Sequence, residues 1–294
     1  MSRRSNRWVT LKSYLAATES KGPRERPRGE YSLYDQPDGD TLTLLSILRE
    51  GGAISRVACI PDWRLCIYSR RDGGIRMLKD TGKACRHSPG EPLVVSIQAG
   101  IIVTAATGVW HGFKEDAKLW LPPGFVQLLD ECRRKRKRFV ICNFGLYGAS
   151  ASGAFGLYAT SASGIGHSNG LILDLRNRVA ERYEPAGRHS DAGDRLDATI
   201  ERLLLAKLPK GWSYIGTRVA APQRGPQAHA DSYAGLCVTF SLAMMLLRLL
   251  NPDRSAAEIQ KYMLRGSKSM QRSRILRLNK YMVERLQSHP RGSL

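Results

Sequence analysis

Apolar residues gather into a few short runs in the second half of the chain, and their spacing predicts the main elements. The run Leu242–Leu247 predicts a buried helix that begins near Cys237. Pro252 is expected to end this helix, because the residue before a proline disfavours helical backbone. The aromatic and β-branched run Phe139–Phe144 predicts a buried strand. This helix and this strand are expected to form the centre of the fold.

Further elements are predicted on either side of that strand. A hairpin is expected around Asn177, with one strand ending at Asp174 and the next running from 179 to 183. Helices are expected over 122–132, 199–208 and 256–264, a strand over 212–219, and a polar loop over 222–234. This order of elements predicts an α+β fold with a central mixed sheet flanked by helices.

The first half of the chain has a looser pattern. Residues 1–40 are basic and broken by proline and glycine, and only 8–17 has a helical pattern, so most of this segment is expected to be flexible. A helix over 41–49 and strands over 57–68 and 93–109 are predicted next. The predicted organisation has four parts, which are a flexible segment (1–40), an α+β accessory region (41–118), a catalytic core (119–264) and a basic tail (265–294).

A tandem duplication lies in the middle of the chain. Residues 144–153 (Phe-Gly-Leu-Tyr-Gly-Ala-Ser-Ala-Ser-Gly) are echoed by residues 155–164 (Phe-Gly-Leu-Tyr-Ala-Thr-Ser-Ala-Ser-Gly). Such small residues provide little core, so an enlarged loop is predicted here, either a flap over the site or a neutral insertion.

The net charge of +20 on 294 residues indicates that the protein has a polyanionic partner. The densest basic run is Arg133, Arg134, Lys135, Arg136 and Lys137. We interpret it as a contact to nucleic-acid phosphates that does not depend on base sequence. A nuclear import signal and a solvated helix end are the alternatives.

Cysteine usage and the N-terminus bear on location. Six cysteines without dense spacing favour a reducing compartment, and residues 1–30 lack the apolar core of a signal peptide. The uncharged stretch 92–113 is interrupted by polar residues and fits strands better than a membrane span. The protein is therefore expected inside a cell, without secretion or a membrane partner.

One set of residues carries candidate chemistry. Cys237 is placed in the predicted first turn of a helix, where free N–H groups and the helix dipole favour a thiolate. His167 begins one strand of the hairpin and Glu184 ends the other, so the hairpin can bring them together. Gln227 precedes Cys237 and can donate an amide N–H. A cysteine peptidase needs these four groups.

The order and spacing of these residues resemble those of the adenovirus maturation protease and the SUMO-specific proteases. That clan carries its catalytic residues in the order His, Asp or Glu, Gln, Cys. The resemblance is closer to related proteases of large DNA viruses, over about residues 120–264. It rests on the segments His167-Ser-Asn-Gly-Leu-Ile-Leu-Asp174, Glu181-Arg-Tyr-Glu-Pro185, Gly225-Pro-Gln227 and Gly235-Leu-Cys237.

The resemblance implies a papain-like cysteine endopeptidase that cleaves virion precursor proteins and is located in a virion or in the host nucleus or cytoplasm. The glycines around His167 do not fit a phosphate-binding loop, so no cofactor is expected. It implies His167 as general base, Glu184 as its orienting carboxylate, Gln227 as oxyanion donor and Cys237 as nucleophile. Two features depart from the clan. Ser168 stands where a tryptophan is common, and the ten positions from Gln227 to Cys237 exceed the usual gap, which leaves Gln223 as a rival donor.

Two other interpretations remain open. A deconjugating protease that acts on a ubiquitin-like modifier would use the same residues. A catalytically inactive virion protein that binds nucleic acid would keep the fold alone. Cys59, Cys66, Cys85 and His87 lack the paired spacing of a zinc knuckle, so no metal is expected.

Overall fold

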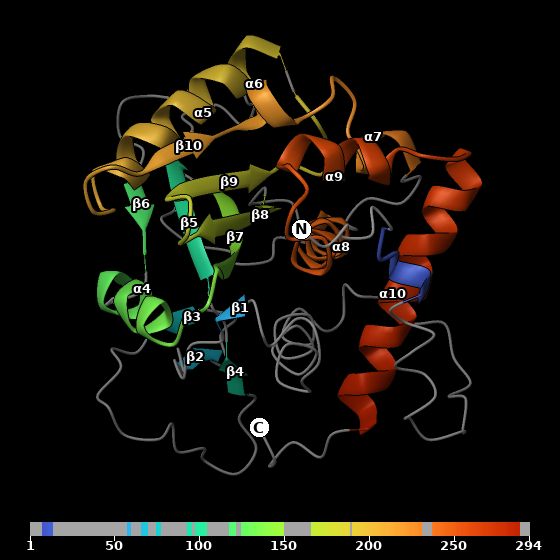
Figure 1. Cartoon of the computed structure of the whole chain (residues 1–294), viewed down its shortest axis with the longest axis horizontal. Coiled ribbons are helices and arrows are strands. Elements are labelled where there is room, and N and C mark those ends of the chain that lie inside the picture. The colour runs from blue at the N-terminus through green and yellow to red at the C-terminus, as the bar shows by residue number, and fades with distance from the viewer. Residues whose placement is uncertain are drawn as a thin grey trace, which may run out of the picture.

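A mixed β-sheet is the centre of the molecule (Figure 1). The computed structural model describes residues 8–13, 58–59, 66–69, 75–77, 93–95, 98–104, 118–121, 125–149, 166–188, 190–230 and 237–288. Within these ranges the sheet has seven strands in the order β10-β9-β8-β7-β5-β6, with β1 also paired to β7. They are β1 (Ala58–Cys59), β5 (Gln98–Thr104), β6 (Lys118–Trp120), β7 (Phe139–Ala149), β8 (Gly166–Asp174), β9 (Val179–Tyr183) and β10 (Ser213–Ile215).

Strand direction follows from the connections. The hairpin strands β8 and β9 are antiparallel, as are β7 and β8, whereas β5 and β1 run parallel to β7. The main sheet therefore joins strands from the predicted accessory region and from the predicted core. A separate antiparallel sheet contains β2 (Cys66–Ser69), β3 (Ile75–Met77) and β4 (Leu93–Val95).

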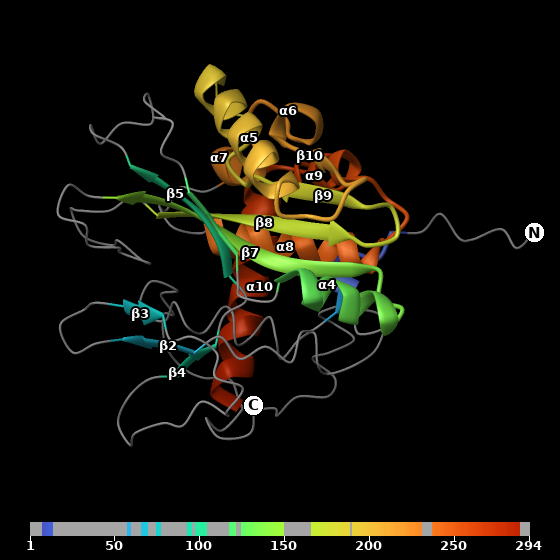
Figure 2. The same ribbon diagram turned by 90° about the vertical axis from the view of Figure 1, so that its left-hand side faces the viewer.

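Helices cover both faces of the main sheet, as Figures 1 and 2 show. One core cluster contains side chains from α4 and α5, and the other contains side chains from α8, α9 and α10. The helices are α4 (Phe125–Arg134), α5 (Ser190–Leu205), α6 (Thr217–Ala220), α7 (Pro226–Ala230), α8 (Cys237–Leu250), α9 (Ala256–Met263) and α10 (Lys268–Ser288). The central strands are buried on both faces, which explains their continuous apolar sequence.

Helix α8 is the central helix on its side of the sheet. Its described side chains from Thr239 to Leu250 are all buried, as expected for a helix that is apolar all round. The predicted mixed sheet flanked by helices is confirmed, as are the hairpin around Asn177 and the helices that became α4, α8 and α9. In the part of the chain that the structure describes, no helix combines the length and apolar character needed to cross a membrane.

Several predicted boundaries were wrong. β7 continues to Ala149, so the first residues of the duplication, expected in a loop, are paired on both sides. α5 begins at Ser190, nine positions before the predicted start. β10 ends at Ile215 and is followed by α6, and the predicted loop contains α7.

The basic segment after α9 forms a helix as far as Ser288. α10 buries Ile275, Leu278 and Tyr281 in the core cluster that includes α8, so this part of the predicted tail packs onto the core. The predicted helix over 41–49 and the second copy of the duplication lie outside the described residues.

Cys132 is fully buried and takes part in a disulfide. Among the described residues the free cysteines are Cys142 and Cys237.

Candidate active site at the start of helix α8

Cys237 is the first residue of α8 and carries a half-buried free thiol. The first N–H groups of a helix have no partner within it, so they face any group bound at this end. Cys142, the other free cysteine described, lies in the middle of β7 and is fully buried. Burial raises the pKa of its thiol to about 12, so it stays protonated and unreactive at neutral pH.

The first turns of α8 are fixed against β8. The hydroxyl of Ser241 donates to the carbonyl of Ser168, at 3.1 Å. One turn later Met245 lies over Gly170, where an added Cβ would come within 2.9 Å of its side chain. Cys237 precedes Ser241 by one turn on the same helix face, so it lies beside the start of β8.

His167 is the second residue of β8, and its backbone pairs with Leu146 of β7. It directly precedes Ser168, the residue whose carbonyl binds α8. Residues alternate along the strand, with Gly170 on the α8 side and Asn169 on the α5 side.

Glu184 directly follows β9 and is 3% exposed. Its carboxylate accepts from Arg182 at 2.9 Å and from the backbone N–H of Ala186 at 3.0 Å. Arg182 also donates to Asn169 at 2.9 Å, so Glu184 and Asn169 contact one guanidinium. The structure therefore holds Glu184 on the side of the hairpin that carries Asn169.

Asp197 of α5 completes this buried cluster. It accepts from Arg182 at 2.7 Å, from Tyr214 at 2.8 Å, and from both the backbone and the hydroxyl of Thr217. Burial by itself raises the pKa of Asp197, but the charge of Arg182 and these hydrogen bonds outweigh it and lower the pKa. Gly216 lies so close that a Cβ would be 2.6 Å from this carboxyl group.

The sequence analysis missed the roles of Asn169, Arg182 and Asp197. One signal in the sequence could have indicated them: Arg182 is a long charged residue in the middle of a predicted strand, and the residues beside it in that strand are buried. Such a residue needs a paired carboxylate from another element. Nothing in the sequence identified Asp197 as that carboxylate, because it comes from a helix on the face of the sheet.

Gln227 lies beside Glu184, as its backbone N–H donates to the carbonyl of Pro185 at 2.9 Å. The contact depends on two glycines: a Cβ on Gly187 would come within 2.2 Å of Gly225, and Gly187 has a φ of +96°. The side-chain oxygen of Gln227 is buried without a hydrogen-bond partner. Gln223, the rival donor, is exposed.

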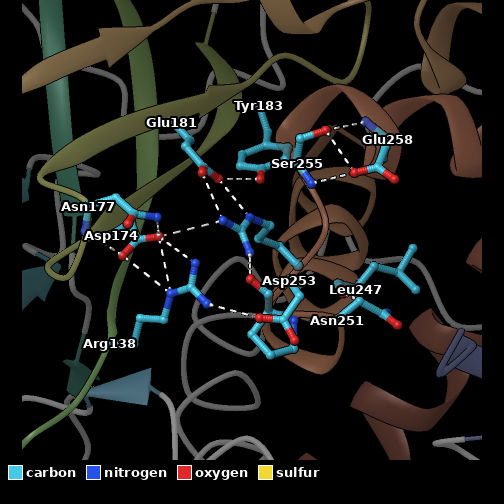
Figure 3. Close-up of polar contacts among 12 residues, drawn as sticks. Arg138, Asp174, Asn177, Glu181, Tyr183, Leu247, Asn251, Asp253, Ser255 and Glu258 are labelled. Carbon is cyan, nitrogen blue, oxygen red and sulfur yellow. Dashed lines mark hydrogen bonds and ion pairs between the residues drawn. The ribbon is translucent and has the colours of Figure 1, made fainter. Parts of the chain in front are cut away.

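A second buried cluster lies at the other end of α8 (Figure 3). Arg248 donates to both carboxylate oxygens of Glu181, each at 2.9 Å, and to the carbonyl of Pro252. Tyr183 donates to the same carboxylate at 2.7 Å. Arg248 also lies 3.7 Å from Asp174, which accepts from Arg138 at 2.9 Å, and Arg138 in turn lies 3.7 Å from Asp253.

The basic run lies at the end of α4 and in the turn that follows. Arg133, Arg134, Lys135 and Arg136 are exposed. Arg133 pairs with Asp130 at 2.8 Å, and Lys135 pairs with Glu131 at 2.6 Å. These are exposed helix-surface pairs, which are weak and leave both cations accessible to a phosphate.

Within the described ranges no group of three or more His, Cys, Asp or Glu side chains is arranged to hold a metal ion. Cys85 and His87 lie outside those ranges, and the side chains of Cys59 and Cys66 are not among those described.

Comparisons with known proteins found little. No protein-family model matches the chain, and no curated protein matches it in sequence. Two crystal structures of the effector protein RavZ of Legionella pneumophila are weakly similar. The first has 12% identity, a TM-score of 0.34, and coverage of 84% of this chain and 64% of RavZ; the second has 11%, 0.25, 91% and 78%. This chain thus spans less than two thirds of the first RavZ chain, and TM-scores this low establish no common fold.

Proposed function

We propose that this chain is a cysteine peptidase with Cys237 as nucleophile, His167 as general base, Glu184 as the carboxylate that orients it, and Gln227 as oxyanion donor. The observation that carries the proposal is the docking of the first turns of α8 onto β8. The Ser241 contact fixes the free thiol beside the strand that carries His167.

The proposed reaction has two halves, and in each half His167 first accepts a proton and then gives it up. His167 takes the thiol proton while the sulfur attacks the peptide carbonyl, and the oxyanion accepts N–H bonds from Gln227 and from the backbone of Cys237. His167 then protonates the departing amine. In the second half His167 removes a proton from water, which attacks the thioester and releases the acid with the free thiol.

Gln227 suits the donor role because its side chain has an unpaired polar atom next to Glu184. A carboxamide presents its oxygen or its NH2 group at one place after a half turn about its last bond. Among the described residues the buried oxygen has no hydrogen-bond partner, so presenting the NH2 group at its place would not cost a bond to this oxygen. Exposed Gln223 has no comparable constraint.

The fold of the adenovirus and SUMO-protease type is part of the proposal, and so is the substrate. The resemblance supports cleavage of virion precursor proteins, and the charge of +20 supports retention on packaged nucleic acid through Arg133–Lys137. A deconjugating protease would instead require a folded ubiquitin-like modifier as its substrate.

Peptide hydrolysis tests the proposal directly. The full chain is incubated with a mixture of denatured proteins, and new N-termini are identified by mass spectrometry. We expect cleavage by the wild-type protein and by Cys142→Ala, and none by Cys237→Ala with an unchanged melting temperature. Cleavage that persists in Cys237→Ala contradicts the proposal. If a parallel incubation shows cleavage of a folded ubiquitin-like conjugate while the denatured mixture stays intact, the deconjugating alternative is favoured.

A further inference from the structure

The segment 8–13 packs against the far end of α8, with residues 8–10 outside regular structure and residues 11–13 in a helical turn. The N–H of Val9 donates to the side-chain oxygen of Asn251 at 2.9 Å, and the side-chain NH2 of Asn251 donates to the carbonyl of Val9 at 3.0 Å. These partners are 242 positions apart in the sequence. One carboxamide thus pairs with both main-chain groups of one residue, as a neighbouring strand would.

The side chain of Asn251 is held in the orientation that this contact requires. It is 7% exposed, and its NH2 group also donates to the carbonyl of Leu247 at 2.9 Å, which orients the carboxamide at the end of α8. Figure 3 labels Asn251 and Leu247 at this place. Because the pairing uses main-chain atoms, it does not require valine, and the Val9 side chain is 39% exposed.

Side chains on both sides of Val9 provide selectivity. Trp8 stacks on Tyr262 of α9, with ring centroids 4.4 Å apart and an interplanar angle of 13°. The guanidinium of Arg254 lies 5.0 Å from the Trp8 ring, and that of Arg265 lies 5.9 Å away. Aromatic stacking and cation–π contacts favour an aromatic residue at this position.

Leu11 is the second anchor. It is 4% exposed and belongs to the core cluster that includes α8, α9 and α10. Reciprocal hydrogen bonds between Thr10 and Ser13 hold the turn that contains it. In Figure 2 this short blue segment lies at the right-hand end of α8.

We propose that the corner formed by Asn251, Tyr262, Arg254 and Arg265 is a binding site for a linear peptide. The ligand is a segment with an aromatic residue, then any residue with a free main-chain N–H, and an apolar residue two positions later, at the start of a helical turn. The chain's own segment 8–11 fills this site, and the proposal requires that the segment can leave it without unfolding the rest of the protein. Helix α8 has 14 residues, which places the site about 20 Å from Cys237, so the inference is independent of the proposed catalysis.

The test compares two substitutions of one residue in the full chain. Val9→Pro removes the N–H that Asn251 accepts, whereas Val9→Ala keeps it and changes only a partly exposed side chain. The probe is a fluorescent synthetic peptide with the sequence of residues 6–14. We expect saturable binding to the Val9→Pro chain at least ten-fold tighter than to the wild-type or Val9→Ala chain, in which the site is filled.

Two controls give the remaining outcomes. A peptide with alanine in place of the tryptophan should bind the Val9→Pro chain at least ten-fold more weakly. The far-ultraviolet circular dichroism of the Val9→Pro chain should match that of the wild type. The inference is overturned if the probe binds no chain, if it binds all chains equally, or if Val9→Pro unfolds the whole protein, because the segment is then an inseparable part of the core.

Discussion

The two ends of helix α8 hold buried polar groups in different ways. At the C-terminal end, both oxygens of Glu181 accept from Arg248, and Asp174 accepts from Arg138, so these charges are paired. Toward the N-terminal end, Gln227, and Asn169 on the opposite face of the sheet, each keep one buried polar atom that has no hydrogen-bond partner among the described residues. A buried cluster in which every polar atom has a hydrogen-bond partner, here called saturated, can serve stability alone. A cluster with unpartnered polar atoms, here called unsaturated, can still form hydrogen bonds to a ligand.

Unpaired atoms are not evidence of a site by themselves. Gln260 and Asn279 also have buried polar atoms without partners, on α9 and α10. What distinguishes the N-terminal end of α8 is the free thiol of Cys237 together with two unpaired amides beside the hairpin.

The largest expected effect is on stability at the saturated end. Arg248→Met leaves Glu181 buried without its cation, and breaking a buried ion pair costs about 3–5 kcal/mol. We expect a loss of this size in the free energy of unfolding, measured with urea. Arg254→Met, which breaks a partly exposed pair with Glu258, is the control and should cost much less. Equal losses in the free energy of unfolding from the two substitutions would contradict the claim that the buried Arg248 cluster stabilises the fold more than an exposed ion pair does.

The next effect is on catalysis at the unsaturated end. Gln227→Ala removes the proposed oxyanion donor and should lower kcat about 10²-fold to 10³-fold, as for other oxyanion donors. Gln223→Ala is the matched control and should leave kcat unchanged. The measurement is steady-state cleavage of a substrate peptide, and a selective loss in Gln223→Ala would reverse the assignment.

A pair of isosteric changes separates the two faces of the hairpin. Glu184→Gln and Glu181→Gln each replace a carboxylate that is bonded to a buried arginine. We expect Glu184→Gln to lower kcat/KM about ten-fold or more, and Glu181→Gln to lower stability with kcat/KM unchanged per folded molecule. Loss of activity in both variants, in proportion to loss of folded protein, would mean that Glu184 is structural as well.

The smallest expected effect depends on pH. The pKa of Asp197 is lower when folded than its ordinary 3.8, so its ion pair stabilises the fold above about pH 4. This stability is lost as the pH falls through the folded-state pKa. Asp197→Asn should be less stable at pH 7 and should lose less stability between pH 4 and pH 2 than the wild type. Urea unfolding at several pH values measures this, and parallel curves for the two proteins contradict it.

The elements that sequence predicted are those with continuous apolar patterns. β7, β8, α8 and α9 lie in the core, where burial dictates residue type. α7 has five residues and starts at a proline, which suits a first helical position but gives no periodic signal. The small residues near the end of β7 have low strand propensity, and pairing with β5 and β8 overrides it.

The candidate site was predictable in its residue types and less so in its supports. Placement of Cys237 at a helix start and of Glu184 at a strand end followed from local pattern. The contacts of Arg182 with Asn169 and Asp197 join three elements, and the Val9 contact joins opposite ends of the chain. Contacts at such separations have no local signal in a single sequence.

The reactivity of the two free thiols tests the central claim most directly. The full chain is treated at neutral pH with a peptide electrophile directed at thiols, and modified cysteines are mapped by mass spectrometry. We predict selective labelling of Cys237 over Cys142, retained in His229→Ala and lost in His167→Ala. Labelling of Cys237 at the same rate in all three proteins, or slow labelling of several cysteines alike, would contradict a catalytic site at the start of α8.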